Sequence, residues 1–101
     1  MSQLQTIRRV TVYADATLEE ALLAKFAELG SNGYTVVECR GKGEHSVVAT
    51  TFSQATQVRI ELLVQPPVAE RILAYLGGGH YQSRAVCACV ETVEVPANER
   101  F

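Results

Sequence analysis

Hydrophobic and polar residues alternate most clearly in the stretch QVRIELLV, residues 57–64. Apolar side chains stand at every second position of this stretch: Val58, Ile60, Leu62 and Val64. The charged residues between them, Arg59 and Glu61, therefore face the other way on an extended chain. A period of two residues, with β-branched residues well represented, predicts a strand with one buried face.

Three further segments have the composition of strands. They cover about residues 6–13, 33–40 and 84–95. Val10 and Val12 alternate with more polar neighbours in the first, and Pro96 is expected to close the last. About fifteen mostly polar residues, 41–56, separate the second and third predicted strands. A loop of this length in a small domain is usually functional or disordered.

Apolar residues at helical spacing predict two helices between these strands. In the first helix they are Leu18, Ala21, Leu22, Phe26 and Leu29. Thr17 and Glu20 form a capping-box pattern at its start, and Gly30 fits the left-handed position after its end. In the second helix, which opens at Pro66, they are Val68, Ala69, Ile72, Leu73 and Leu76.

The order strand, helix, strand, strand, helix, strand predicts a single α+β domain over residues 1–101. We expect the ferredoxin-like βαββαβ arrangement, a four-stranded antiparallel sheet with both helices on one face. The tail after Pro96 looks loose. Apolar residues stand on both faces of the predicted strands, as in Leu62 and Leu63, which suggests that the second face is buried in an oligomer.

Composition and charge exclude some classes of protein. The net charge is −2, with no basic patch to neutralise a nucleic-acid backbone. No apolar run has the length of a membrane span, and the first residues lack the apolar core of a signal peptide, so we expect a cytoplasmic protein. Three cysteines make no disulfide framework. We expect Cys39, Cys87 and Cys89 to be small buried residues rather than metal or redox groups.

The sequence Gly41-Lys42-Gly43 directly follows the second predicted strand. Glycines let an anion approach the backbone closely, and successive N–H groups can form an anion-binding nest. Lys42 and Arg40 would add positive charge. The pattern is neither a P-loop nor a dinucleotide fingerprint. Taken alone it also fits an ordinary turn, so the residues themselves leave both interpretations open.

The order of these segments resembles the PII signalling proteins. The resemblance rests on Gly33-Tyr34-Thr35-Val36, the Gly-Lys-Gly turn, the long loop that follows, the strand of residues 58–64 and the helix end Phe26–Gly30. It spans about residues 6–95. It implies a non-enzymatic homotrimer of ferredoxin-like subunits that binds adenine nucleotides in clefts between subunits. The long loop, the T-loop at about residues 42–56, would change shape with the ligand and dock on a protein partner.

The resemblance also implies roles for single residues. Thr35 would contact the adenine edge, Val64 would pack against the base, and Lys42 and Arg84 would hold phosphate. Gly77, Gly78 and Gly79 with His80 would lie across the cleft. The complete expected nucleotide-binding set is Thr35, Arg40, Gly41, Lys42, Gly43, Val64, Gly77, Gly78, Gly79, His80 and Arg84.

Departures from the PII pattern refine the expected ligands. His45 stands where the 2-oxoglutarate-binding members place glutamine, and residues 93–97 lack two phosphate-binding arginines. ADP or AMP is therefore favoured over ATP, with no required cofactor. The chain looks closer to divergent PII-like proteins tied to inorganic carbon, whose candidate partners are bicarbonate transporters or carboxysome-related proteins. Bicarbonate would then bind at Gly41, Lys42, Gly43 and Glu44.

Two other classes of function remain open at this stage. A small ferredoxin-like enzyme that hydrolyses a phosphate compound could use Asn32, although the sequence shows no set of nucleophile, base and orienting residue. A metal-binding trimer of similar architecture is the other alternative. RNA recognition is disfavoured because the central strands lack stacking aromatics.

Overall fold

The computed structural model describes residues 3–40, 57–79 and 86–101. Its elements are β1 (Leu4–Asp15), the short 3-10 helix η1 (Ala16–Leu18), α1 (Glu19–Glu28), β2 (Thr35–Cys39), β3 (Gln57–Val64), α2 (Pro66–Leu76) and β4 (Cys87–Pro96). The strands form one sheet in the order β2-β3-β1-β4, and every neighbouring pair is antiparallel. The predicted ferredoxin-like fold is confirmed.

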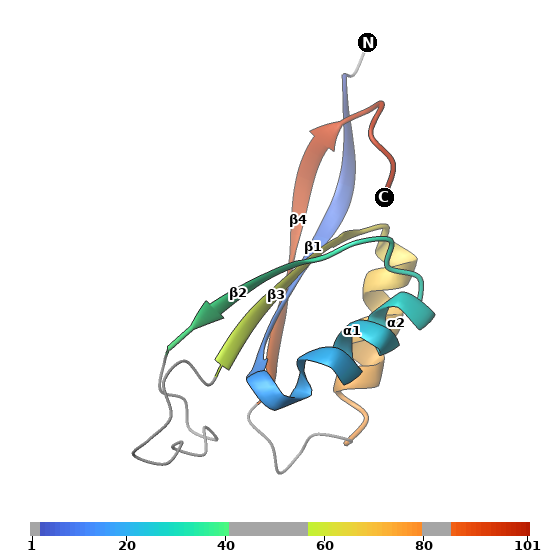
Figure 1. Cartoon of the computed structure of the whole chain (residues 1–101). Helices are drawn as coiled ribbons and strands as arrows, with labels where there is room; N and C mark the ends of the chain where they lie inside the picture. Colours follow the sequence, from blue (N-terminus) through green and yellow to red (C-terminus); the bar gives the residue numbers. More distant parts are fainter. Residues whose placement is uncertain (1–2, 41–56, 80–85) are drawn as a thin grey trace.

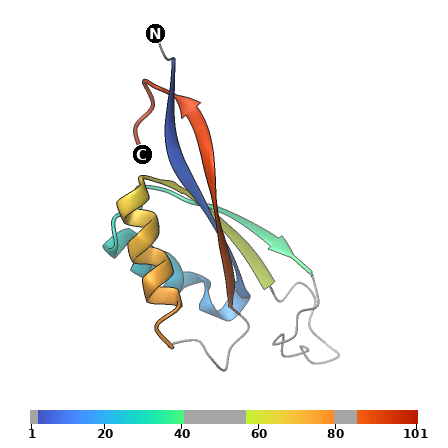
Figure 2. The same cartoon turned by 180° about the vertical axis from the view of Figure 1, so that it is seen from behind.

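Both helices cover the same face of the sheet, and no helix of the described residues covers the other, open face (Figures 1 and 2). The start of β1 and the end of β4 extend beyond the helices as a long two-stranded ribbon (Figure 2). β1 and β4 are longer at this end than the pattern predicted, because register pairs continue out to Leu4 and Pro96. β2 is shorter than predicted and begins at Thr35.

The core lies between the sheet and the helices. Strand β3 contributes its alternate residues as predicted, and each is at most 1% exposed: Val58, Ile60, Leu62 and Val64. They pair in register with core residues of β1, for example Leu62 with Val10 and Ile60 with Val12. Leu22 and Phe26 of α1 and Ile72 of α2 close the core from the helix side. Ala21, predicted on the core stripe, is exposed.

The predicted capping box is wrong. Asp15 is the N-cap of η1, and its Oδ1 accepts from Thr17 N at 2.9 Å and from Thr17 Oγ1 at 2.8 Å. Strand β1 runs as far as Asp15, so this carboxylate reaches the first free N–H groups, and Thr17 lies inside the turn as a donor. The α-helix proper starts later, at Glu19.

The turn after α1 holds the helix layer together. Gly30 has a φ of +118°, as its predicted place after the helix requires. The N–H of Ser31 donates to Phe26 O at 2.9 Å, and Arg71 Nε of α2 donates to Leu29 O at 3.0 Å. Within three more residues the chain reaches Gly33 and passes to the open face.

Candidate functional site

The open face of the sheet is set by the same alternation as the core. Because Val10, Leu62 and their neighbours face the helices, the residues between them face the other way. Across this face Thr35 of β2 pairs with Glu61 of β3, which pairs in turn with Thr11 of β1. Leu63 pairs with Arg9. Polar, charged and apolar side chains therefore stand side by side on the open face.

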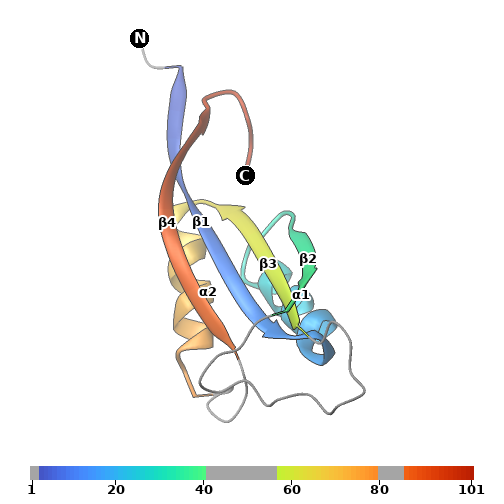
Figure 3. The same ribbon diagram turned by 90° about the vertical axis from the view of Figure 1, so that its left-hand side faces the viewer.

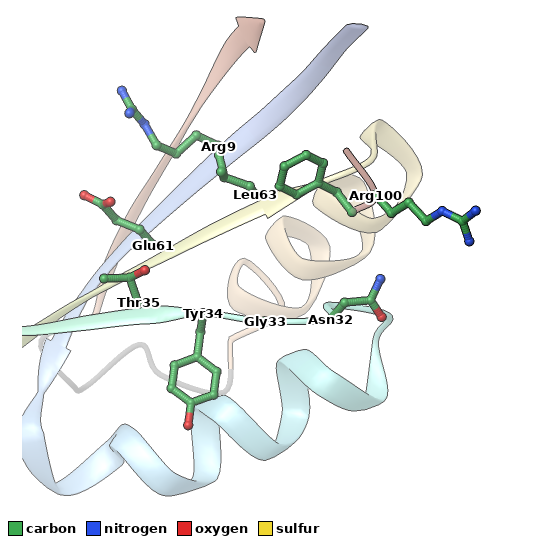
Figure 4. A pocket seen from close by; sticks show the side chains of 9 residues that line it. Arg9, Asn32, Gly33, Tyr34, Thr35, Glu61, Leu63 and Arg100 are labelled. Atoms are coloured by element: carbon green, nitrogen blue, oxygen red, sulfur yellow. The ribbon is translucent and has the colours of Figure 1, made fainter. Parts of the chain in front are cut away.

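A pocket of about 350 Å³ lies where β2 begins and β3 ends. Its lining comes from four parts of the chain: Arg9, Asn32, Gly33, Tyr34, Thr35, Glu61, Leu63, Arg100 and Phe101. Thr35, Glu61 and Leu63 project from the two strands (Figure 4). Tyr34 points the other way, over α1 (Figure 4). The volume is at the lower end of the range of small-molecule sites.

The last described segment, the tail (residues 97–101), supplies one wall of this pocket through Arg100 and Phe101. It turns back at the end of β4 and runs toward the end of β3 (Figure 3). Its first N–H, from Ala97, donates to Gln3 O at 2.9 Å. Backbone and side-chain hydrogen bonds connect this tail to Gln3, to Gln5 of β1 and to Pro96, and the expected loose tail stays a prediction.

Both signs of charge meet at the pocket. Arg9 forms an ion pair with Glu91 of β4, with Nη2 and Nε at 2.9 and 3.1 Å from the same carboxylate oxygen. The hydrogen bond from this carboxylate, and then its charge, raise the pKa of Arg9. Glu61 lies 3.2 Å from Arg59 Nε. The site can therefore present a fixed cation and a carboxylate to one ligand.

The nucleotide-binding residues expected from the PII resemblance fall into two groups. Thr35 lies in the pocket. Arg40 follows the far end of β2, and Gly77, Gly78 and Gly79 follow α2 at that same end of the sheet (Figures 1 and 3). The five residues of β2 carry the chain from Thr35 to Arg40, a distance of about 17 Å for an extended strand. The other expected residues, Gly41, Lys42, Gly43, Glu44, His80 and Arg84, lie outside the described residues.

The expected contact of Val64 with a base needs correction. Its side chain is 1% exposed and belongs to the core, so it faces away from the pocket. The apolar residue that β3 presents to the pocket is Leu63, which is 38% exposed. The alternation of β3 already contained this signal, since a strand that buries Val64 must turn Leu63 outward. Sequence reasoning also missed Arg9, Glu61 and the tail residues.

The expected burial of Cys87 and Cys89 is not found within the single chain. Cys87 and Cys89 are exposed on the open face, opposite Tyr13 and Thr11, whereas Cys39 is half-buried. Their alternation with Ala88, which packs on the core, places them on this face. In the parts of the chain that the structure describes, no three His, Cys, Asp or Glu residues gather as metal ligands would. Within those same ranges no helix has the length and hydropathy of a membrane span.

Comparison with known proteins gives consistent relatives. The family model for nitrogen regulatory protein P-II matches residues 7–98. The comparison with curated proteins found no match. A PII-like signalling protein from Thermus thermophilus is 33% identical, with a TM-score of 0.78 over 94% of each chain. CPII, a PII-like protein from Thiomonas intermedia solved with ADP, AMP and bicarbonate, is 17% identical, with a TM-score of 0.77 over 93% of this chain and 99% of that one.

Proposed function

Because this chain belongs to the nitrogen regulatory protein P-II family, whose model covers residues 7–98, we propose that it is a PII-like signalling protein that binds an adenine nucleotide. Its role is non-catalytic: ligand occupancy selects the shape of the T-loop, and the T-loop selects a protein partner. The observation that carries this proposal is the pocket around Thr35, the residue that the PII resemblance indicates as an adenine contact.

The chemistry of the pocket suits a purine base. The Thr35 hydroxyl can donate or accept a hydrogen bond, and the Glu61 carboxylate can accept one from an exocyclic amine. These two residues are partners on neighbouring strands, so both can reach one edge of the base. Leu63 provides an apolar surface beside them. A flat ring with a polar edge is a ligand that this combination can hold.

The two groups of expected ligand residues support a site between subunits. Thr35 and Arg40 are about 17 Å apart along β2, which is longer than a nucleotide as small as AMP. A site between two chains would let one molecule of AMP touch both groups, each supplied by a different chain. We propose a homotrimer in which the pocket of one subunit faces the Arg40 and Gly77–Gly79 end of the next.

The proposed ligands are ADP and AMP, with inorganic carbon as the second signal. The similarity to CPII, which was solved with ADP, AMP and bicarbonate, supports this choice. Bicarbonate would bind to the backbone N–H groups and Lys42 of the Gly41–Glu44 segment, which lies outside the described residues. The proposed partner is a bicarbonate transporter or a carboxysome-related protein, and the proposed location is the cytoplasm.

Calorimetric titration with AMP, ADP and ATP, each with and without bicarbonate, tests the proposal. We expect saturable binding near one nucleotide per subunit, tighter for AMP or ADP than for ATP, and a change in affinity when bicarbonate is present. Light scattering should give the mass of three chains. Failure of all three nucleotides to bind would overturn the nucleotide-binding proposal. If the nucleotide affinity is the same with and without bicarbonate, only the proposed carbon signal is overturned.

Deletion of residues 46–54 tests the role of the T-loop. The deletion should leave the trimer intact and abolish capture of the partner transporter from solubilised membranes. Loss of the trimer on deletion would instead make this segment structural.

A further inference from the structure

The tail is held in place by one side chain of β1. The amide nitrogen of Gln5 lies within hydrogen-bond distance of three carbonyls at the end of the chain, which share its two N–H donors: 3.2 Å to Pro96 O, 3.4 Å to Ala97 O and 2.5 Å to Glu99 O. These bonds link residues more than ninety positions apart in the sequence. They fix the direction in which the tail leaves β4 and returns along the sheet.

The burial of Ile7 shows that this end of the open face is covered. Ile7 lies on the same face of β1 as Gln5 and Arg9, because Val10 and Val12 face the helices. Its side chain is nevertheless 0% exposed. Ile7 is not part of the core cluster on the helix side, so cover from the returning tail accounts for its burial. The tail is therefore packed, and the position of its last residues follows from the fold.

The packed tail places an aromatic ring in the wall of the nucleotide pocket. Phe101 is half-buried and lines the same pocket as Thr35, Glu61 and Leu63. Arg100 lines it too, but its guanidinium points away from Leu63 (Figure 4). The tail therefore contributes a flat ring to the interior of the pocket and a cation to its outer side.

We propose that Phe101 is a base-stacking residue that determines the specificity of the pocket, and that Gln5 is the residue that positions it. This inference rests on the proposed function. A purine has a polar edge and two flat faces. Thr35 and Glu61 serve the edge, whereas Leu63 and Phe101 supply apolar surfaces for the faces. An aromatic ring is the stronger of these two surfaces, because it can stack on any base.

Substitutions of Phe101 separate stacking from simple apolar cover. F101A should weaken AMP binding about tenfold, the scale of one lost base stack. F101Y should bind as the wild type does, because it keeps the ring. F101L should lose most of the AMP affinity that F101A loses, because leucine keeps an apolar side chain but has no flat ring. N98A, an exposed change in the same tail, is the matched control and should have no effect.

The Gln5 variant tests positioning. Q5A removes the donor to the three carbonyls and should weaken AMP binding to a similar extent. In the double variant Q5A/F101A the losses should not add, because both act through the same ring. Additive losses would show that Gln5 supports the strand pair generally and would overturn its positioning role.

A measurement on the wild-type protein keeps the inference testable if a variant fails to fold. With AMP bound, nuclear Overhauser effects should connect the Phe101 ring protons to H2 or H8 of the adenine. Their absence, wild-type affinity of F101A, or wild-type affinity of F101L would each overturn the stacking proposal while nucleotide binding stands. If the wild-type protein binds no adenine nucleotide, the proposed function and this inference fail together. A gain in affinity in F101A would show that the ring blocks the pocket, which also overturns it.

Discussion

On the helix side of the sheet, Leu62 packs among Val10 and the helix residues and is 1% exposed, whereas on the open side its neighbour Leu63 stands 38% exposed beside Arg9. The two leucines are consecutive in one strand. Every residue that β3 turns toward the helices is apolar, so this side contributes stability. The open side mixes leucine, threonine and ion pairs and encloses a pocket.

The two faces of the sheet carry different kinds of residue: those on the helix side stabilise the fold, and those on the open side can bind a ligand or a second subunit. A buried leucine on the helix side contributes mainly through the apolar area that folding removes from water. The same residue on the open side contributes little to folding and remains available to a ligand or a second subunit. Matched substitutions on the two faces test this separation.

Leu62→Ala and Leu63→Ala form the most direct pair. Leu62→Ala leaves a cavity in the core and should lower the free energy of unfolding by about 2–5 kcal/mol. Leu63→Ala removes the same atoms from an exposed position and should change it by less than about 1 kcal/mol, while weakening AMP binding. Urea unfolding at one fixed protein concentration measures the first effect and calorimetry the second. Equal losses of stability would contradict the separation of the two faces.

The fold could be predicted because each element carries its own periodic signal. The two-residue period of β3 and the helical stripes of α1 and α2 are local, and both were correct in type. The helix start was wrong because Asp15 and Thr17 are both good capping residues, and the choice depends on where β1 ends. That end is decided by pairing with β3, which lies more than forty residues later.

The candidate site could be predicted only in part, for two different reasons. Thr35, which lines the pocket, was predicted from the PII resemblance, because it closely follows a glycine at the start of a strand. Val64 was wrong because its role was carried over by residue type, without regard to the face of β3 that it occupies. Phe101 could not be predicted locally, since the tail that carries it is hydrogen-bonded to Gln5, more than ninety positions earlier in the chain.

Gly30→Ala tests the turn that carries the chain from the helix layer to the open face. Gly30 has a positive φ, and a Cβ there would lie 3.1 Å from Val68 Cγ2 and 3.0 Å from Arg71 Nη2. We expect a loss of about 1–3 kcal/mol, mainly from the strained backbone, because the two side chains can shift. Gly33→Ala is the matched control, since a Cβ there meets nothing within 4 Å. A comparable loss of stability in both variants, by urea unfolding, would show that the turn is not the cause.

Thr35→Val tests the pocket without disturbing the strand. Valine has the shape of threonine and favours strands, so stability should hardly change. Loss of the hydroxyl should weaken AMP binding about three- to tenfold, the scale of one hydrogen bond. Thr92→Val makes the same change at an exposed position of β4 outside the pocket and should bind as the wild type does. Calorimetry that finds the two variants equal would exclude a hydrogen bond from Thr35 to the ligand.

Glu91→Gln should change stability and AMP affinity less than the other substitutions do. Whether AMP affinity rises or falls shows what Glu91 does. Arg9 and Glu91 are both well exposed, so their ion pair should contribute little to stability. The pKa of Arg9 is raised in the folded protein. The stabilisation from its ion pair is therefore complete at any pH below the pKa of Arg9 in the unfolded chain and is lost only in strong alkali. The Arg9 cation therefore persists between about pH 6 and 9, and stability should not vary with pH in that range on its account.

In the wild-type protein the Glu91 carboxylate competes with an anionic nucleotide for Arg9, and Glu91→Gln should remove this competition. With the carboxylate neutralised, Arg9 is free to turn into the pocket that it lines, where its charge attracts the anionic nucleotide. AMP affinity should rise about twofold in low salt and return to the wild-type value in about 1 M salt, where surface charges are screened. Glu94→Gln removes the same charge from an exposed position of β4 outside the pocket and should show no such rise. If Glu91→Gln instead weakens AMP binding, Glu91 holds Arg9 in its binding position, and the open face is organised in advance for its ligand as closely as the helix side is organised for packing.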